Sequence, residues 1–181
     1  GTFITGGRFT LNLLWSNSIR IEVGGNGLSG TLAVNDGVWH HVAVVYNPLA
    51  TNDYSLYIDG VLNVSGNLTV TTSTSTGNVV IGQRIDGNGK FDGAIDEVRI
   101  WNVARTASEI ANNMNSEFCV IPTSLKAYYK FNQGVASGTN TGLTSLTDNS
   151  GNSGNGTLNG FSLSGGSSNW VTGATLSQGN L

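Results

Sequence analysis

The stretch from Asp36 to Asn102 alternates large apolar residues with polar or small ones, and this pattern restricts the chain to a fold built of strands. It contains three pieces, which read DGVWHHVAVVYN, YSLYIDGVLNVSG and GNVVIGQRIDGNGKFDGAIDEVRIWN. Each piece is bounded by Gly, Asn or Asp, which favour turns. A period of two indicates half-buried antiparallel strands, and no helical period of comparable length competes with it. The sequence therefore predicts an all-β fold.

Three segments in this region also resemble a known family. DGVWHHVAVVYN, YIDG and FDGAIDEVRIWNVARTASEI, in this order and spacing, resemble the C-terminal half of a laminin-G-like domain of the concanavalin A-like jelly-roll class, the bacterial variety related to pentraxins. The resemblance covers about two thirds of the chain. It implies a jelly-roll sandwich of two antiparallel sheets.

Short local signals predict where the chain turns and where it forms a helix. Ser16-Asn17 lies between two strand-like runs and predicts a hairpin turn, and Asp59-Gly60 favours a type I′ turn, in which both central residues have positive φ. In NVARTASEIANNMN, Thr106 and Glu109 have the spacing of a capping box. We therefore expect one short helix near residues 106–114, with Ile110 on its buried face.

Composition limits the classes of partner. Charged residues make up 10% of the chain and the net charge is −3, so neither nucleic acid nor an anionic membrane is expected to bind. No apolar run approaches the roughly 20 residues that span a bilayer, so membrane insertion is not expected. A surface that is polar but carries few charges is typical of a secreted all-β protein, which predicts an extracellular or bacterial cell-surface location.

The order of the motifs predicts an unusual domain organisation. By the resemblance, residues 1–118 form a laminin-G-like sandwich that lacks its usual first strands, and residues 119–124 are a linker. Residues 125–181 contain a predicted first strand in LKAYYKF, an Asp/Asn/Gly loop and a predicted second strand in LNGFSL, and this order resembles the missing start of such a domain. The chain is either a window cut from tandem repeats, or its tail completes the sandwich in cis or in a neighbouring subunit. We expect completion, because so short a tail would not bury a sandwich core alone.

Two oxygen-rich loops are candidates for a structural Ca²⁺ site, because Ca²⁺ takes carboxylate, amide and carbonyl oxygens as ligands. The first is IDGNGKFDGAIDE, and the second is DNSGNSGN, which begins at Asp148. Jelly rolls of the class that this chain resembles often hold Ca²⁺ near the Asp of their final strand, here Asp96. Asp-Gly pairs also form good turns without any ion. The candidate metal ligands are Asp86, Asn88, Asp92, Asp96 and Asp148.

Other patterns argue against catalysis. His40 and His41 are adjacent, so on a strand they face opposite sides and cannot share one metal. Hydrolysis of glycosides needs a close pair of acids, and the E-x-D-x-x-E pattern of the glucanases with this fold is not present. For Cys119 a buried apolar role is favoured, with pairing between subunits as the alternative. The chain is therefore predicted not to be an enzyme.

Aromatic residues are candidates for carbohydrate binding, because their faces stack on sugar rings. Trp39 and Trp101 lie at core-like strand positions, where packing is the favoured role. Trp15 beside a turn, Trp170 beside a Gly/Ser loop and Tyr129 are the predicted carbohydrate-binding residues.

These observations favour a non-enzymatic extracellular module for adhesion or assembly. It would bind a glycan or another surface ligand, or self-associate head to tail as a filament subunit joined by β-strand complementation. The alternative is a carbohydrate-binding module of a secreted polysaccharide-degrading enzyme, and a weaker rival is a catalytic glycanase of the same fold.

Overall fold

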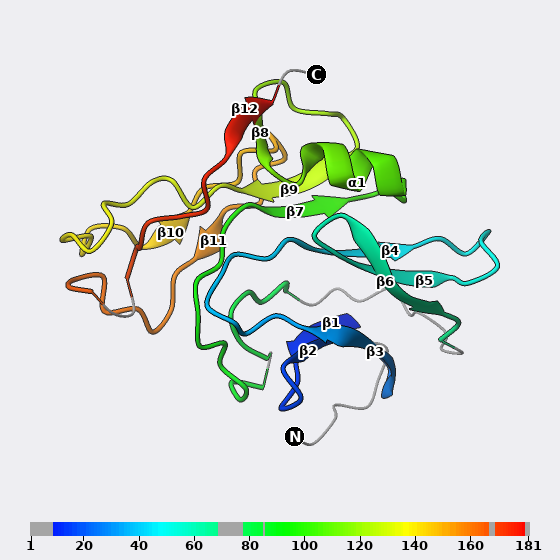
Figure 1. The fold of residues 1–181 in the computed structure, drawn as a ribbon. Helices are drawn as coiled ribbons and strands as arrows, with labels where there is room; N and C mark the ends of the chain where they lie inside the picture. Colours follow the sequence, from blue (N-terminus) through cyan, green and yellow to red (C-terminus); the bar gives the residue numbers. More distant parts are fainter. Residues whose placement is uncertain (1–8, 69–77, 85, 167–168, 180–181) are drawn as a thin grey trace. The chain divides into compact units, whose positions relative to one another are not determined.

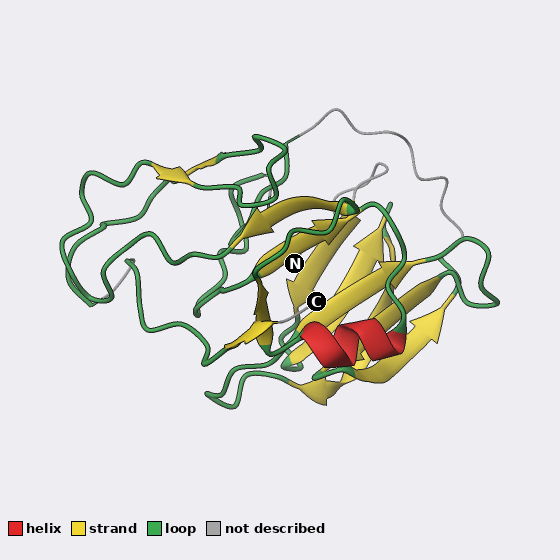
Figure 2. Cartoon of the chain, turned by 90° about the horizontal axis from the view of Figure 1, so that it is seen from above, coloured by secondary structure: helices red, strands yellow, loops and turns green. Residues whose placement is uncertain are grey.

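The computed structural model describes residues 9–68, 78–84, 86–166 and 169–179. Within these ranges the regular structure is mostly antiparallel β-strand with one short helix, as predicted, and Figure 2 shows the strands in yellow and the helix in red. Contacts divide the chain into two compact units. Unit 1 consists of residues 1–92 and 104–114, and unit 2 consists of residues 93–103 and 115–181.

Unit 1 contains two three-stranded antiparallel sheets (Figure 1). The first has the order β1-β2-β3 and the second the order β4-β5-β6. The strands are β1 (Phe9–Leu13), β2 (Ser18–Val23), β3 (Asn26–Ala33), β4 (Val42–Tyr46), β5 (Tyr54–Ile58) and β6 (Val61–Gly66). Asn17 has a φ of 67°, and Asp59 and Gly60 have φ values of 50° and 77°. Both predicted hairpin turns are therefore confirmed.

The two sheets of unit 1 pack face to face through alternate residues. On β2 the buried side chains include Ile21 and Val23, and on β5 they include Leu56 and Ile58. Each fully buried side chain of this size contributes about 1.5–3 kcal/mol to stability. Because the side chains of a strand alternate between its two faces, the intervening residues point away from this core. The predicted two-sheet sandwich is thus present in unit 1.

The helix α1 (Ala107–Asn113) also belongs to unit 1 and begins at a capping box, as predicted. The Thr106 hydroxyl accepts a hydrogen bond from the Glu109 N–H at 3.2 Å, and the Glu109 carboxylate accepts one from the Thr106 N–H at 2.8 Å. Ile110 is buried. A Cβ atom at Gly60 would lie 3.1 Å from Ala111, so the helix sits directly against the β5–β6 turn. Nothing in the described ranges is a helix long and apolar enough to cross a bilayer.

Unit 2 is built of short strands. Its strands are β7 (Val98–Trp101), β8 (Ser116–Phe118), β9 (Leu125–Tyr129), β10 (Ser145–Leu146), β11 (Gly156–Thr157) and β12 (Ser177–Gly179). β7 pairs with β9 and β10 with β11, in both cases antiparallel, whereas β8 and β12 run parallel. The predicted strand in LKAYYKF is therefore confirmed as β9. Completion of the sandwich of residues 1–118 by the tail stays a prediction.

The interior of unit 2 combines aromatic rings with an ion pair. The Arg99 guanidinium lies 4.5 Å from the centre of the Phe118 ring and 5.3 Å from that of Tyr128, which is fully buried. Glu97 accepts hydrogen bonds from Arg99 at 2.5 Å and from the Tyr128 hydroxyl at 2.7 Å. Burial raises the pKa of Glu97, although both hydrogen bonds act to lower it. Burial and the adjacent Glu97 together raise the pKa of Tyr128 far above its usual value.

Two predictions about packing are wrong, and a third is confirmed. Trp39 is 44% exposed rather than in the core, because β4 begins only at Val42. Cys119 is exposed, since it follows the buried end of β8 at Phe118. Trp101, in contrast, is partly buried and meets the Phe118 ring edge-on at 5.6 Å, which agrees with its predicted packing role.

Two predicted strands do not form. Residues 78–84 form no strand, although their apolar residues predicted one, and residues 158–163 form none either. Nearby, the bridge between Thr139 and Ser164 is an isolated pair. The Thr/Ser-rich run TVTTSTSTGN predicts an edge strand, because β-branched Thr favours strands. This run falls almost entirely on residues 69–77, which lie outside the described ranges.

Tyr128→Phe tests the polar interior of unit 2. The change removes the donor to Glu97 and the oxygen that accepts the Phe118 N–H at 3.2 Å, so we expect unfolding in urea to become easier by about 1–3 kcal/mol. The control is Tyr129→Phe, which removes a hydrogen bond to the Gly154 carbonyl at an exposed site and should cost about 1 kcal/mol or less. Equal losses in the two variants would contradict a structural role for the buried hydroxyl.

Candidate functional site

A hollow of about 250 Å³ lies within unit 1, between the β4–β5 loop, the strands that flank it and the residues that lead into α1. We call it the unit 1 hollow. Its lining residues are Val45, Asn47, Ala50, Asn52, Asp53, Ser55, Tyr57, Ala104, Arg105 and Thr106. This volume lies just below the range of about 300–1,000 Å³ typical of pockets for drug-sized ligands, so it suits one small molecule or one unit of a larger one.

The strand period explains why β5 contributes to the hollow. Leu56 points into the core of unit 1, so its neighbours Ser55 and Tyr57 point to the opposite face. Tyr57 is half-buried there, and its hydroxyl has no hydrogen-bond partner within the part of the chain that the structure describes. The hollow therefore has an aromatic wall that carries a free hydroxyl group.

Hydrogen bonds hold the β4–β5 loop in shape. The Asn47 side chain accepts from the Leu49 N–H at 3.1 Å, and the Asn47 N–H donates to the Asp53 carbonyl at 2.8 Å. The Asp53 carboxylate accepts from the Leu68 N–H at 3.1 Å. The Asn52 amide donates to the Ser65 hydroxyl on β6 at 2.9 Å. These bonds fix the polar rim, so a ligand would meet a largely pre-formed surface.

The hollow is lined by few charged residues. Asp53 is the one carboxylate among the lining residues, and Arg105 is the one cation. Arg105 also forms an ion pair with Glu109 at 3.0 Å, one turn into α1. A site with this composition offers donors, acceptors and a ring to a neutral polar molecule. It does not hold the two acids that glycoside hydrolysis requires.

The predicted metal ligands are divided between the two units. Asp86, Asn88 and Asp92 lie in unit 1, where Asp86 accepts from the Asn88 N–H at 3.0 Å and pairs with Arg84 at 3.1 Å. The Asn88 hydrogen bond is the main cause that lowers the pKa of Asp86. Asp92 is exposed. The first loop is thus a turn stabilised by its own side chains.

Asp96 lies in unit 2 and connects two segments of it. Its carboxylate accepts from the Glu97 N–H at 2.9 Å and from the Ala174 N–H at 3.0 Å. A Cβ at Gly173 would overlap one of its oxygens, so the chain approaches Asp96 closely at this point. Burial raises the pKa of Asp96 and outweighs the two hydrogen bonds.

Asp148, also in unit 2, is saturated by protein donors. One carboxylate oxygen accepts from the N–H groups of Tyr128 and Ser150, and the other from the Ser150 hydroxyl and the Gly154 N–H, all at 2.9 Å. A carboxylate has about four lone-pair positions, and all are used. Burial acts to raise the pKa of Asp148, but these hydrogen bonds outweigh it and hold the pKa below the usual value.

The described residues do not form a calcium site with several carboxylates. Nowhere in residues 9–68, 78–84, 86–166 and 169–179 do three His, Cys, Asp or Glu side chains converge as metal ligands would. Asp148 has no lone pair left for an ion in this conformation. Structural Ca²⁺ therefore stays a prediction, and no step of the function is assigned to it.

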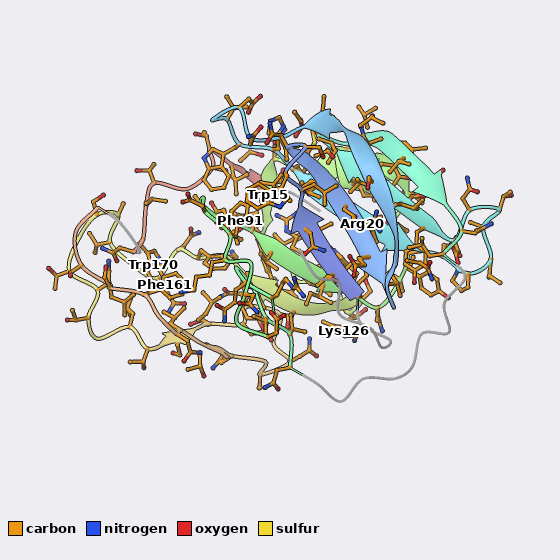
Figure 3. The ribbon with its side chains drawn as sticks, turned by 90° about the horizontal axis from the view of Figure 1, so that it is seen from below. Trp15, Arg20, Phe91, Lys126, Phe161 and Trp170 are labelled. Carbon is orange, nitrogen blue, oxygen red and sulfur yellow. The ribbon has the colours of Figure 1, made fainter. Side chains whose placement is uncertain are left out.

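None of the three predicted carbohydrate-binding residues lines the unit 1 hollow. Trp15 lies in the β1–β2 turn and is 95% exposed (Figure 3). Tyr129 belongs to unit 2 and donates to the Gly154 carbonyl at 2.6 Å. Trp170, also in unit 2, is buried, and its indole N–H donates to the Phe131 carbonyl at 2.7 Å. Carbohydrate binding by these residues stays a prediction.

The residues that line the unit 1 hollow were not predicted as a site from the sequence. In YSLYI, Ser55 and Tyr57 occupy the positions that face away from the core, so the alternation contains a usable signal. The loop PLATND supplies the polar groups. Nothing in the sequence indicates that the residues before α1 lie against this loop, because the two segments are far apart in the chain and only the tertiary fold brings them together.

A second polar cluster of unit 1 fixes the β5–β6 turn. The His40 ring lies 2.8 Å from Asp59 through Nδ1 and 3.1 Å from Asp36 through Nε2. Asp59 also accepts the His41 N–H at 2.9 Å. Mainly through the hydrogen bond to Asp59, the pKa of His40 is raised.

This raised pKa predicts how stability depends on pH. In the unfolded chain a His has a pKa of about 6.5. The protonated His40 therefore stabilises the folded state fully below that pH, and this stabilisation is lost as pH rises through the higher pKa of the folded state. We expect the melting temperature to fall as pH rises from about 6 to about 8. Because the glutamine in His40→Gln cannot become charged, we expect the decrease in melting temperature that is due to His40 to be absent in this variant. An identical fall in wild type and variant, measured by circular dichroism, would show that another group is responsible.

Comparison with known proteins gives a family for this architecture. Residues 1–111 match the laminin-G family model described as the concanavalin A-like lectin/glucanases superfamily. Over 93 residues the chain is 30% identical to the sushi, von Willebrand factor type A, EGF and pentraxin domain-containing protein 1 of Rattus norvegicus, a match that covers 46% of this chain and 3% of that protein.

A solved structure shares the fold. The crystal structure of a proposed carbohydrate-binding protein from Bacteroides ovatus ATCC 8483 superimposes with a TM-score of 0.66 at 23% sequence identity. The match covers 86% of this chain and 46% of that one, so the chain spans less than half of this relative. The fold prediction of a concanavalin A-like sandwich is confirmed. Because the family model matches residues 1–111 of the 181, more than half of the chain, the chain belongs to the concanavalin A-like lectin/glucanases superfamily as a laminin-G-like member.

Proposed function

We propose that the chain is a non-catalytic carbohydrate-binding module, and that its unit 1 hollow holds a neutral sugar unit. The observation that carries this proposal is the composition of the hollow, in which the Tyr57 ring faces the polar loop of Asn47, Asn52 and Asp53. A sugar ring presents C–H groups on its faces and hydroxyl groups around its edge. An aromatic wall beside amide and carboxylate groups complements both kinds of surface.

The size and charge of the hollow limit the kinds of ligand that it can bind. A volume of about 250 Å³ fits one ring better than several. Arg105 is already paired with Glu109, and Asp53 is the one carboxylate among the lining residues, so the site does not favour an acidic sugar. We therefore assign a neutral sugar unit, either free or at an accessible position of a longer glycan.

The comparisons support the proposal. The family is lectin-like, and the Bacteroides ovatus protein with the same fold is itself proposed to bind carbohydrate. The similarity to a pentraxin domain-containing protein supports the predicted extracellular location. Within this proposal the chain acts outside the cell as the binding part of a larger assembly.

Affinity electrophoresis in gels that contain starch, mannan, xylan or mixed-linkage β-glucan tests the proposal. We expect at least one of these neutral glycans to retard the wild type, and Tyr57→Ala to weaken that affinity by about tenfold or more, because the ring wall is lost. Asn78→Ala, at an exposed position that does not line the hollow, is the control and should bind as wild type. Loss of retardation in Trp15→Ala but not in Tyr57→Ala would contradict the hollow and favour Trp15.

A second candidate is the predicted assembly role, which one observation favours. On β1 the side chains of Phe9, Leu11 and Leu13 pair across the sheet with Val23, Ile21 and Ile19, which are in the core of unit 1. The three β1 side chains are nevertheless 54%, 43% and 39% exposed. The core face thus continues onto a strand at the end of its sheet order, where a β-strand of a second copy would bury it.

Leu11→Lys tests this candidate, because a lysine on an edge strand opposes further pairing. If copies assemble through β1, light scattering coupled to gel filtration should show larger species for the wild type that grow with concentration, and a monomer for the variant. Val61→Lys changes an exposed apolar residue on β6 and should assemble as wild type. A wild type that stays monomeric at every concentration would contradict the candidate.

A further inference from the structure

We propose that unit 2 carries a second carbohydrate-binding site, in a hollow of about 230 Å³ near strand β10. We call it the unit 2 hollow. It lies outside the residues that match the family model, and it shares no residue with the unit 1 hollow. Its lining residues are Lys130, Phe131, Asn132, Gln133, Thr147 and Asn149.

The walls of this hollow are held in place by side-chain hydrogen bonds. The Gln133 amide donates to the Ser145 carbonyl at 2.6 Å and accepts from the Thr147 N–H at 2.8 Å. It therefore connects the segment after β9 to β10 and to the residue that follows it. Because both the nitrogen and the oxygen of this amide are already hydrogen-bonded, the Gln133 side chain loses little conformational freedom when a ligand binds.

Glu117 orients two groups that face the hollow. One of its carboxylate oxygens accepts from the Lys130 ammonium at 3.0 Å, and the other accepts from the Asn132 amide at 2.7 Å. The carbonyl oxygen of the Asn132 side chain and the remaining Lys130 protons stay available to a ligand. Because Glu117 neutralises Lys130, the hollow favours a neutral ligand rich in hydroxyl groups over an anion.

Phe131 has a backbone conformation that its own sequence does not favour. Its φ is 53°, which is a strained value for a bulky aromatic residue. The Trp170 indole N–H donates to the Phe131 carbonyl at 2.7 Å, and the Trp170 ring lies so close to Gly134 that a Cβ there would overlap it. The strain is thus held by the buried Trp170. Such strain concentrates where a side chain must be presented to a ligand.

Asn149, three residues after β10, also lines the hollow. Its N–H donates to the Tyr128 carbonyl at 2.7 Å, which ties its backbone to β9. Its side-chain amide is exposed and has no hydrogen-bond partner among the residues that the structure describes. A free amide in the same hollow as an aromatic residue provides a donor and an acceptor for adjacent hydroxyl groups of a sugar.

Titration of the whole chain, labelled with ¹⁵N, tests the site. The probes are the methyl glycosides of glucose, galactose, mannose, xylose and N-acetylglucosamine. With at least one probe, we expect the side-chain amide signals of Asn132 and Asn149 to shift saturably in the Tyr57→Ala background, in which the unit 1 hollow is impaired. If these signals do not move with any probe, the proposal is overturned, whatever the outcome for the unit 1 hollow.

Phe131→Gly separates binding from structure. Glycine adopts positive φ without strain, which offsets the greater conformational freedom that it has in the unfolded chain, so we expect the melting temperature to change little while the affinity falls about tenfold or more. Asn149→Ala should weaken binding in the same way, and Asn78→Ala is the matched control. Unchanged affinity in both Phe131→Gly and Asn149→Ala would overturn the assignment. A fall in melting temperature in Phe131→Gly would show that the ring serves packing and would equally count against it.

Discussion

The alternation of side chains along β5 builds the core and the candidate site of unit 1 at the same time. Leu56 packs between the two sheets, and that direction forces Ser55 and Tyr57 to the outer face. The core thereby fixes where the ring of Tyr57 stands. The loop before β5 and the capped start of α1 then close the hollow around it. A shift of β5 by one residue would exchange core and site, which is why the strand register controls both.

In unit 2, polar interactions provide much of the stabilisation that apolar packing provides in unit 1. The strands are short, and carboxylates connect the segments between them. Asp148 ties its loop to β9 through Tyr128, and Asp96 ties the start of β7 to Ala174. Such groups are stable in a partly buried place because donors satisfy them. The same bonds show which protein groups hold this loop, rich in Asp, Asn and Gly, in its conformation.

Local signals predicted local structure well. The turn at Asp59-Gly60 and the helix capped by Thr106 have signatures that span only a few residues, so both can be recognised in the sequence, although distant groups such as His40 also bind Asp59. Residues 78–84 show the limit of such signals. Their run of three apolar residues, Val79 to Ile81, is typical of a strand, but a strand also needs a partner with a free edge, and that is decided by residues far away in the chain.

The candidate sites were harder to predict for the same reason. An aromatic residue beside a turn looks alike in sequence whether it is exposed, as Trp15 is, or buried, as Trp170 is. What separates them is Gly134, whose missing side chain leaves room for the Trp170 ring more than thirty residues away in the chain. From this position the Trp170 indole donates a hydrogen bond to the Phe131 carbonyl, which holds Phe131 in its strained conformation. Trp170 thus acts on the unit 2 hollow through Phe131, and its own ring need not touch a ligand for the hollow to depend on it.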